Sequence, residues 1–194
     1  MPFIYDTLVA TLISMTVLLI LSSIQTEATQ SNTARTSRNV AKTQAQDFST
    51  WLEEDLGEIG KNMSSNAAAF QTHQDSTKWH TTEFTFKYET VSGTLVRTRY
   101  ELEKAGTRTV DGTTETLYEV VRSRKVGSGS WQQKGQSPAN LGYFEVNKLD
   151  KNATPVSNPS EVESIRVRFS VIAPFQSEET FLRRVRRSAV IPYE

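Results

Sequence analysis

The sequence predicts an α+β fold in which one long N-terminal helix packs on an antiparallel β-sheet of about six strands. Three observations lead to this expectation. The chain opens with an apolar stretch, continues with apolar residues at helical spacing, and ends in segments where apolar and polar residues alternate. We expect the helix over residues 1–63 and a β-rich globular domain over residues 64–194.

Composition narrows the classes of function. The chain has 194 residues, with 22 Lys and Arg against 22 Asp and Glu, so its formal net charge is zero. Nucleic-acid binding requires a basic surface that neutralises phosphates, and a neutral chain gives it no support. The chain contains no cysteine, which excludes disulfides, thiolate metal sites and cysteine nucleophiles.

The apolar stretch Leu8–Ile24 has the composition of a membrane span. It holds twelve apolar residues and five hydroxyl residues, and no charge. The hydroxyls can bond to carbonyls one turn earlier, so a membrane helix tolerates them. Seventeen residues rise roughly 25 Å, slightly less than a bilayer core, and the segment before Leu8 makes up the difference. We therefore expect a transmembrane part at about residues 7–24, with Asp6 near the headgroup boundary.

Three interpretations of this opening segment compete. A cleaved signal peptide should carry a basic start and a small-residue cleavage site, yet the first basic residue is Arg35. A plain single-span anchor is the second interpretation. The positive-inside rule would then place Arg35, Arg38 and Lys42 in the cytoplasm, against an exported domain. The third interpretation is a helix that assembles with the helices of other subunits. In this interpretation the Asp6 carboxylate has a role in assembly.

The beginning of the chain resembles the type IV pilins and the type II secretion pseudopilins. In that family the mature chain begins with an apolar residue, carries an acid at its fifth position and continues as one long helix. If Met1 is removed, Asp6 takes that position. The family's acid is normally glutamate, and its basic leader and processing glycine are missing here, so we expect either a mature chain or no leader processing. The resemblance assigns assembly to Pro2, Phe3 and Asp6.

This resemblance implies a structural subunit of a filament or secretion pseudopilus, and no enzyme. Its helix would lie in membrane lipid before assembly and then pack with copies of itself or with related subunits. The acid is thought to pair with a neighbour's amino terminus, which neutralises two charges at once in a low-dielectric core. The chain would cross the inner membrane once, with its C-terminal domain in the periplasm or on an external filament. The alternative is a membrane-anchored accessory or binding domain of a larger complex.

The polar segment after the apolar stretch leads into an amphipathic helix. Gln25–Arg38 is rich in small polar residues and reads equally well as a helix or as a flexible linker. A stripe at helical spacing follows it, formed by Ala41, Ala45, Phe48, Leu52, Leu56, Ile59 and Met63. The stretch FSTWLEEDLGEIG resembles the minor pilins and J-type pseudopilins, and its glycines are typical helix stop signals.

The rest of the chain alternates with a period of two. TEFTFKYE, LVRTRYELE, TLYEVVRSRK, YFEVNKLD, ESIRVRFSVIA and TFLRRVRRSAVI predict six strands. Residues 64–78, 127–142 and 151–161 are expected to be loops. The pairs VRTRYELE with TLYEVVRSR, and the closing ESIRVRFSVIA, are again similar to minor pilins.

Patterns that carry chemistry are weak. His73 and His80 lack a third ligand at metal spacing, and solvated histidines are the expectation. The acidic side chains of Glu53, Glu54, Asp55 and Glu58 are expected on a solvated helix face. We identify no catalytic, metal or cofactor residues. The one dense basic patch is Arg183, Arg184, Arg186 and Arg187, which either protects an edge strand from aggregation or docks an acidic partner or lipid headgroups.

Overall fold

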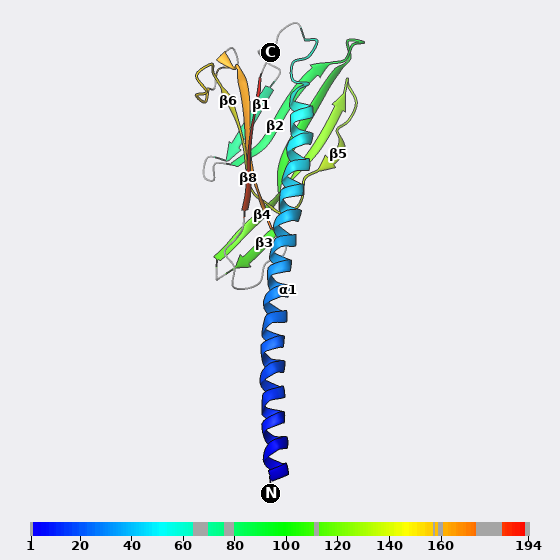
Figure 1. The fold of residues 1–194 in the computed structure, drawn as a ribbon. Helices are drawn as coiled ribbons and strands as arrows, with labels where there is room; N and C mark the ends of the chain where they lie inside the picture. The colour runs from blue at the N-terminus through cyan, green and yellow to red at the C-terminus, as the bar shows by residue number, and fades with distance from the viewer. Residues whose placement is uncertain are drawn as a thin grey trace.

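A single helix dominates the computed structural model of the chain. The structure describes residues 2–63, 70–75, 80–110, 113–156, 158, 161–173 and 184–192. Helix α1 comprises Pro2–Leu56, 55 residues, and its rise of 1.5 Å per residue makes it about 82 Å long. Its C-terminal half lies against the β-sheet, while its N-terminal half extends far beyond it (Figure 1). The α+β fold expected from the sequence is confirmed.

The continuity of α1 has a simple cause. Proline occurs only at its first position, where no intrahelical bond is lost, and no glycine occurs before Gly57. Residues 25–38 are helical throughout, so the flexible-linker alternative is wrong. The helix ends at Leu56, seven residues earlier than expected. Ile59 and Met63 nevertheless pack on the core from the turns that follow.

The turn segment after α1 is bonded to the end of a strand. Gly60 has a φ of 70°, a conformation that glycine adopts without strain, and its backbone N–H donates to the Lys87 carbonyl at 3.0 Å. The backbone N–H of Glu89 donates to the Lys61 carbonyl at 2.9 Å. The Asn62 amide adds a hydrogen bond to the Glu89 carbonyl at 2.9 Å. These bonds fix the C-terminal end of the helix to the sheet.

Eight strands form one antiparallel sheet over the described residues. They are β1 Phe70–Asp75, β2 His80–Glu89, β3 Leu95–Val110, β4 Thr113–Val126, β5 Gln132–Gln136, β6 Leu141–Leu149, β7 Ser164–Ile172 and β8 Arg184–Pro192. Their order is β1-β2-β3-β4-β6-β7-β8, and β5 pairs with β4 beside that path. Six strands were expected, and the two additional ones, β1 and β5, lie in segments expected to be loops.

The sheet consists of two groups of strands joined at a narrow place. β4 and β6 pair at one position, Tyr118 opposite Leu141. The two groups also meet where the Thr81 hydroxyl accepts a hydrogen bond from the Val146 backbone N–H at 2.8 Å. The His80 ring lies beside the rings of Tyr118 and Tyr143, with centroids 5.0 and 5.6 Å away. The expectation of a solvated His80 is therefore wrong, because this side chain is half-buried in an aromatic cluster.

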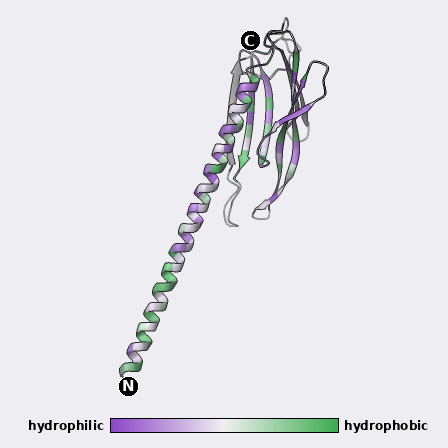
Figure 2. Cartoon of the chain, turned by 90° about the vertical axis from the view of Figure 1, so that its right-hand side faces the viewer, coloured by the Kyte–Doolittle hydropathy of each residue, from purple (hydrophilic) through white to green (hydrophobic). Residues whose placement is uncertain are grey.

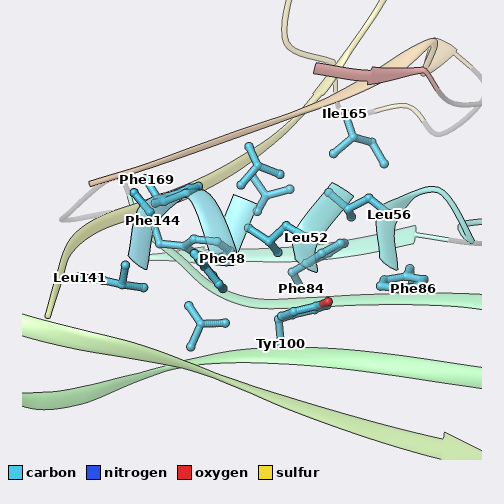
Figure 3. Packing of buried hydrophobic residues seen from close by; sticks show 14 of the residues in the cluster. Phe48, Leu52, Leu56, Phe84, Phe86, Tyr100, Leu141, Phe144, Ile165 and Phe169 are labelled. Carbon is cyan, nitrogen blue, oxygen red and sulfur yellow. The ribbon is translucent and has the colours of Figure 1, made fainter. Parts of the chain in front are cut away.

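The core lies between the C-terminal half of α1 and the two strand groups (Figure 3). Phe48 is near its centre, with ring centroids 5.0 Å from Phe169 and 6.3 Å from Phe144. Alternation holds as expected, and the inward side chains include Phe84, Phe86, Tyr100, Ile165, Val167, Phe169 and Val171. Burying such side chains contributes roughly 1.5–3 kcal/mol each. The helix stripe is thus what closes the domain.

Candidate assembly site on the N-terminal helix

The N-terminal half of α1 touches nothing else in the described chain. Every side chain from residue 3 to residue 33 is exposed. The first buried side chain along the helix is Ser37, and contact with the domain becomes regular from Ala41 onward. Figure 2 shows the free half leading away from the sheet. The molecule is therefore a compact domain on a helical rod.

Within the free half, the segment Leu8–Ile24 exposes apolar side chains around its whole circumference. Consecutive residues Leu18, Leu19, Ile20 and Leu21 point in four directions about the axis, and all are more than half exposed, Leu19 by 72%. A helix that is apolar on all sides belongs in a membrane or inside a protein assembly. By length and composition α1 can cross a membrane, and none of its most apolar window is buried in the domain.

Three hydroxyl groups within this segment, and that of Thr7 just before it, donate to carbonyls of the helix itself. Thr11 Oγ1 donates to the Thr7 carbonyl at 2.7 Å, and Ser14 Oγ donates to the Ala10 carbonyl at 2.8 Å. Thr16 makes the same bond to the Leu12 carbonyl at 2.8 Å. Internal bonds of this kind remove the cost of an unpaired hydroxyl in hydrocarbon. The polar residues of the segment are thus compatible with a lipid or protein environment.

Asp6 is the exception within the segment. It carries the one charged side chain before Glu27, and it is exposed on the second turn of the helix. The side chain of Phe3, one turn earlier, is 78% exposed. Pro2 begins the helix, and its side chain lies outside the described residues. The three residues assigned to assembly therefore lie together at the free tip of the rod.

A buried ionic cluster fixes the other end of the rod to the sheet. Arg122 Nη2 of β4 lies 2.5 Å from Asp55 Oδ1, and Arg124 Nη2 lies 3.6 Å from the same atom. The Tyr100 hydroxyl donates to Asp55 Oδ2. Burial, together with the charge and hydrogen bond of Asp55, raises the pKa of Tyr100 well above its ordinary value. A solvated Asp55 was expected, and this was wrong.

Trp51 completes this cluster. The Arg122 guanidinium lies 5.5 Å from the centre of its ring, and the Tyr100 ring lies 5.8 Å away. Gly135 of β5 covers the indole so closely that a Cβ there would lie 3.3 Å from Trp51 Cζ2. The strand β5 therefore closes over the point where helix and sheet are joined. Glu53 and Glu54, by contrast, are exposed as expected.

A second polar cluster lies on β6 and β7. Arg168 Nη2 is 2.5 Å from Glu145 Oε2, and the Tyr143 hydroxyl donates to the same carboxylate. Burial alone would raise the pKa of Glu145, but hydrogen bonds from Tyr143 and Asn147 and the Arg168 guanidinium outweigh it and lower that pKa. Burial and the bond to Glu145 raise the pKa of Tyr143 to about 12.

The basic patch of the sequence falls on the last strand. Arg184, Arg186 and Arg187 belong to β8, which is the end strand of the sheet path and pairs with β7. Their side chains, and Arg183 altogether, lie outside the described residues. The position of β8 agrees with the edge-strand interpretation. Its partner-docking alternative stays a prediction.

Comparison of the chain with protein-family models, with curated proteins and with solved structures gives no match. Among the described residues no group of three or more His, Asp or Glu side chains is placed to hold a metal ion. The feature that stands out is a long unbroken helix, apolar near its free end and joined to its domain by the core and a buried ionic cluster.

Proposed function

We propose that this chain is a structural subunit of a pilin-like filament or secretion pseudopilus, which assembles through its N-terminal hydrophobic helix. The observation that carries the proposal is the division of α1. Its C-terminal half closes the core of the β-domain, while residues 3–33 are exposed along one unbroken helix. A rod of this kind places the domain at a fixed distance from whatever surrounds the apolar tip.

The apolar side chains of residues 3–24 must be removed from water, and two environments can do this in turn. Each Å² of apolar surface left in water costs roughly 25 cal/mol, so residues 3–24 are unfavourable in solvent. Before assembly, the environment is membrane lipid, with the chain crossing the inner membrane once. After assembly, the environment is the same segment of other copies or of related subunits. The β-domain then lies in the periplasm or on the outside of a filament.

The small polar segment between tip and domain fits such packing. Residues 25–33 carry no large apolar side chain, and Thr26, Thr29 and Thr33 bond their hydroxyls back to the helix. Small residues allow helices to approach closely. A plain anchor has no need for a helix that continues through this segment without a break. A bundle of rods does, because each rod must keep its shape beyond the membrane.

Asp6 supplies the test of the proposal. A carboxylate in a low-dielectric bundle needs a positive partner, and the amino terminus of a neighbouring copy is the partner that the resemblance implies. We expect Asp6→Asn to enter the membrane normally and to lose assembly. Asp6→Glu keeps the charge and should assemble. Insertion is measured by carbonate extraction of membranes, and assembly by chemical cross-linking in membranes and electron microscopy of sheared material.

Two outcomes would contradict the proposal. Normal assembly of Asp6→Asn would show that no charge pairing is needed at this position. Full function after replacement of Leu8–Ile24 by an unrelated membrane span would show a simple anchor on an accessory domain. The N-terminal sequence of protein purified from membranes gives a separate check, because a chain that begins near Ala28 has lost the segment as an export signal.

A further inference from the structure

Three positive side chains stand side by side on the outer face of the sheet. Lys87 of β2 pairs in register with Arg97 of β3, and Arg97 pairs with Lys125 of β4. Successive side chains of a strand alternate between faces. Phe86, Tyr88, Val96 and Thr98 point into the core, so their neighbours Lys87 and Arg97 point outward. Neighbouring strands are about 4.8 Å apart, so the three residues form a row of about 10 Å, the cationic row.

The cationic row is unfavourable within the isolated chain. Like charges placed directly opposite each other on neighbouring strands are destabilising. Arg99, by contrast, pairs with Glu101 at 2.9 Å, and Arg168 pairs with Glu145 at 2.5 Å. None of the ion pairs between the residues that the structure describes includes Lys87, Arg97 or Lys125. Among the described residues the row therefore has no ion-pair partner, and an acidic partner would complement its charge.

A firm aromatic flank lies beside the row. The Trp131 ring covers the Arg99 guanidinium, whose central carbon lies 4.6 Å from the ring centre. The same guanidinium forms an ion pair with Glu101 at 2.9 Å. Both Trp131 and Arg99 are half-exposed. Tryptophan and arginine are enriched among the residues that dominate binding at protein interfaces. The half-exposed Trp131 ring therefore gives a protein partner an apolar contact next to the charges.

The position of the row argues against the chain's own membrane as its partner. The Lys87 carbonyl accepts a hydrogen bond from the Gly60 N–H, so the row lies level with the C-terminal end of α1. The helix from Ile24 to Leu56 rises about 48 Å. Lipid headgroups around the apolar tip are therefore out of reach. An acidic segment of a protein carries the complementary charge and can reach the row at this distance.

We propose that the outer face of β2, β3 and β4 is a docking surface for an acidic segment of a partner protein. Carboxylates of the segment pair with Lys87, Arg97 and Lys125, and the segment lies against Trp131. Binding relieves the repulsion within the row, because the partner supplies the negative charge that the described part of the fold does not place there. This inference is independent of the proposed assembly through the helix, since the two surfaces lie at opposite ends of the rod.

The test uses the full chain in detergent micelles and a fluorescent peptide of ten glutamates, with a peptide of ten glutamines as the neutral probe. We expect the glutamate peptide to bind, and its affinity to fall steeply with added salt. Arg97→Glu should weaken binding at least tenfold. Lys104→Glu makes the same change of charge on an exposed residue seven positions along β3, and it should keep binding within twofold.

A check on folding accompanies the charge reversal. Arg97→Gln removes the central charge without introducing a negative one, and it should weaken binding severalfold while leaving the thermal midpoint unchanged or higher. Equal binding by Arg97→Glu and Lys104→Glu would overturn the proposal, as would equal binding of the two peptides. A third contrary outcome uses the chain held in nanodiscs of neutral lipid. If that chain binds added phosphatidylglycerol vesicles but does not bind the glutamate peptide, the proposal is also overturned.

Discussion

Arg122 of β4 reaches the carboxylate of Asp55 on α1, with Nη2 2.5 Å from Oδ1, and both side chains are nearly buried. This pair joins the last turn of the helix to the middle of the sheet. Apolar packing of Phe48, Leu52 and Leu56 holds the helix on the sheet. Because such packing is not directional, it defines the rotation of the helix and its position along the sheet less narrowly than a polar contact does. We expect the ionic pair to define both, because a buried polar network favours one arrangement of its members.

Removing Asp55 should destabilise the domain strongly. Asp55→Ala leaves Arg122 charged, buried and without its partner, and breaking a buried pair in this way costs about 3–5 kcal/mol. The measurement is the free energy of unfolding in urea, followed by tryptophan fluorescence, for the full chain in detergent. Glu54→Ala is the matched control on an exposed face, where a change within about 0.5 kcal/mol is expected. Equal effects of the two substitutions would refute the anchoring role.

Stability should fall at alkaline pH in part because of Tyr143. Its pKa is raised to about 12 in the folded chain, against about 10 for an ordinary tyrosine. The folded state therefore holds the proton more tightly than the unfolded state. The stabilisation is complete below pH 10 and is lost as the pH rises from about 10 through 12. Tyr100, whose pKa is also raised, acts in the same direction.

The variant Tyr143→Phe isolates this contribution. It lacks the titrating proton, so its thermal midpoint should fall less steeply than that of the wild type between pH 10 and pH 12. Tyr5→Phe, on the exposed apolar tip, is the control and should follow the wild-type curve. Parallel curves for Tyr143→Phe and the wild type would show that the Tyr143 hydroxyl does not contribute.

A break in the polar segment of α1 should separate folding from assembly. Proline in a helix interior removes a hydrogen bond and costs about 3 kcal/mol. Ala28 is exposed and lies outside the domain, so Ala28→Pro should leave the thermal midpoint of the β-domain unchanged. It should kink the rod and reduce assembly in membranes, scored by cross-linking. The control Ala28→Ser keeps the helix and should assemble. Undiminished assembly of Ala28→Pro would mean that a continuous rod is not required.

The strands that could be predicted from the sequence are those in which apolar and polar residues alternate, because one face of the strand is buried. Phe84, Phe86 and Tyr88 alternate with polar residues because β2 has the core on one side and solvent on the other. The sequences FQTHQD of β1 and QQKGQ of β5 carry almost no such record. These strands exist because β2 and β4 offer backbone partners, which is a tertiary effect that no local pattern reports.

Asp55 shows the same limit for the candidate site. In sequence it stands beside Glu53 and Glu54, and nothing local distinguishes it from them. Its partners Tyr100, Arg122 and Arg124 come from strands 45 to 69 residues away, so the pairing is set by the fold. The apolar segment at the free end of the helix could be predicted because it follows from composition alone, whereas the assembly role of Asp6 stays a prediction. A run of apolar residues with one carboxylate is unusual wherever it lies.

Contact between the apolar tips of neighbouring copies tests the central claim most directly. The chain has no cysteine, so single cysteines placed one at a time from Leu8 to Leu21 report that contact without background. Oxidation in membranes, scored by gel mobility, should give dimers at positions that recur every three to four residues, as one face of a helix against another requires. Val91→Cys, on a fully exposed loop of the β-domain, is the reference for random collision. A yield along the whole segment no higher than at Val91 would contradict assembly through this helix.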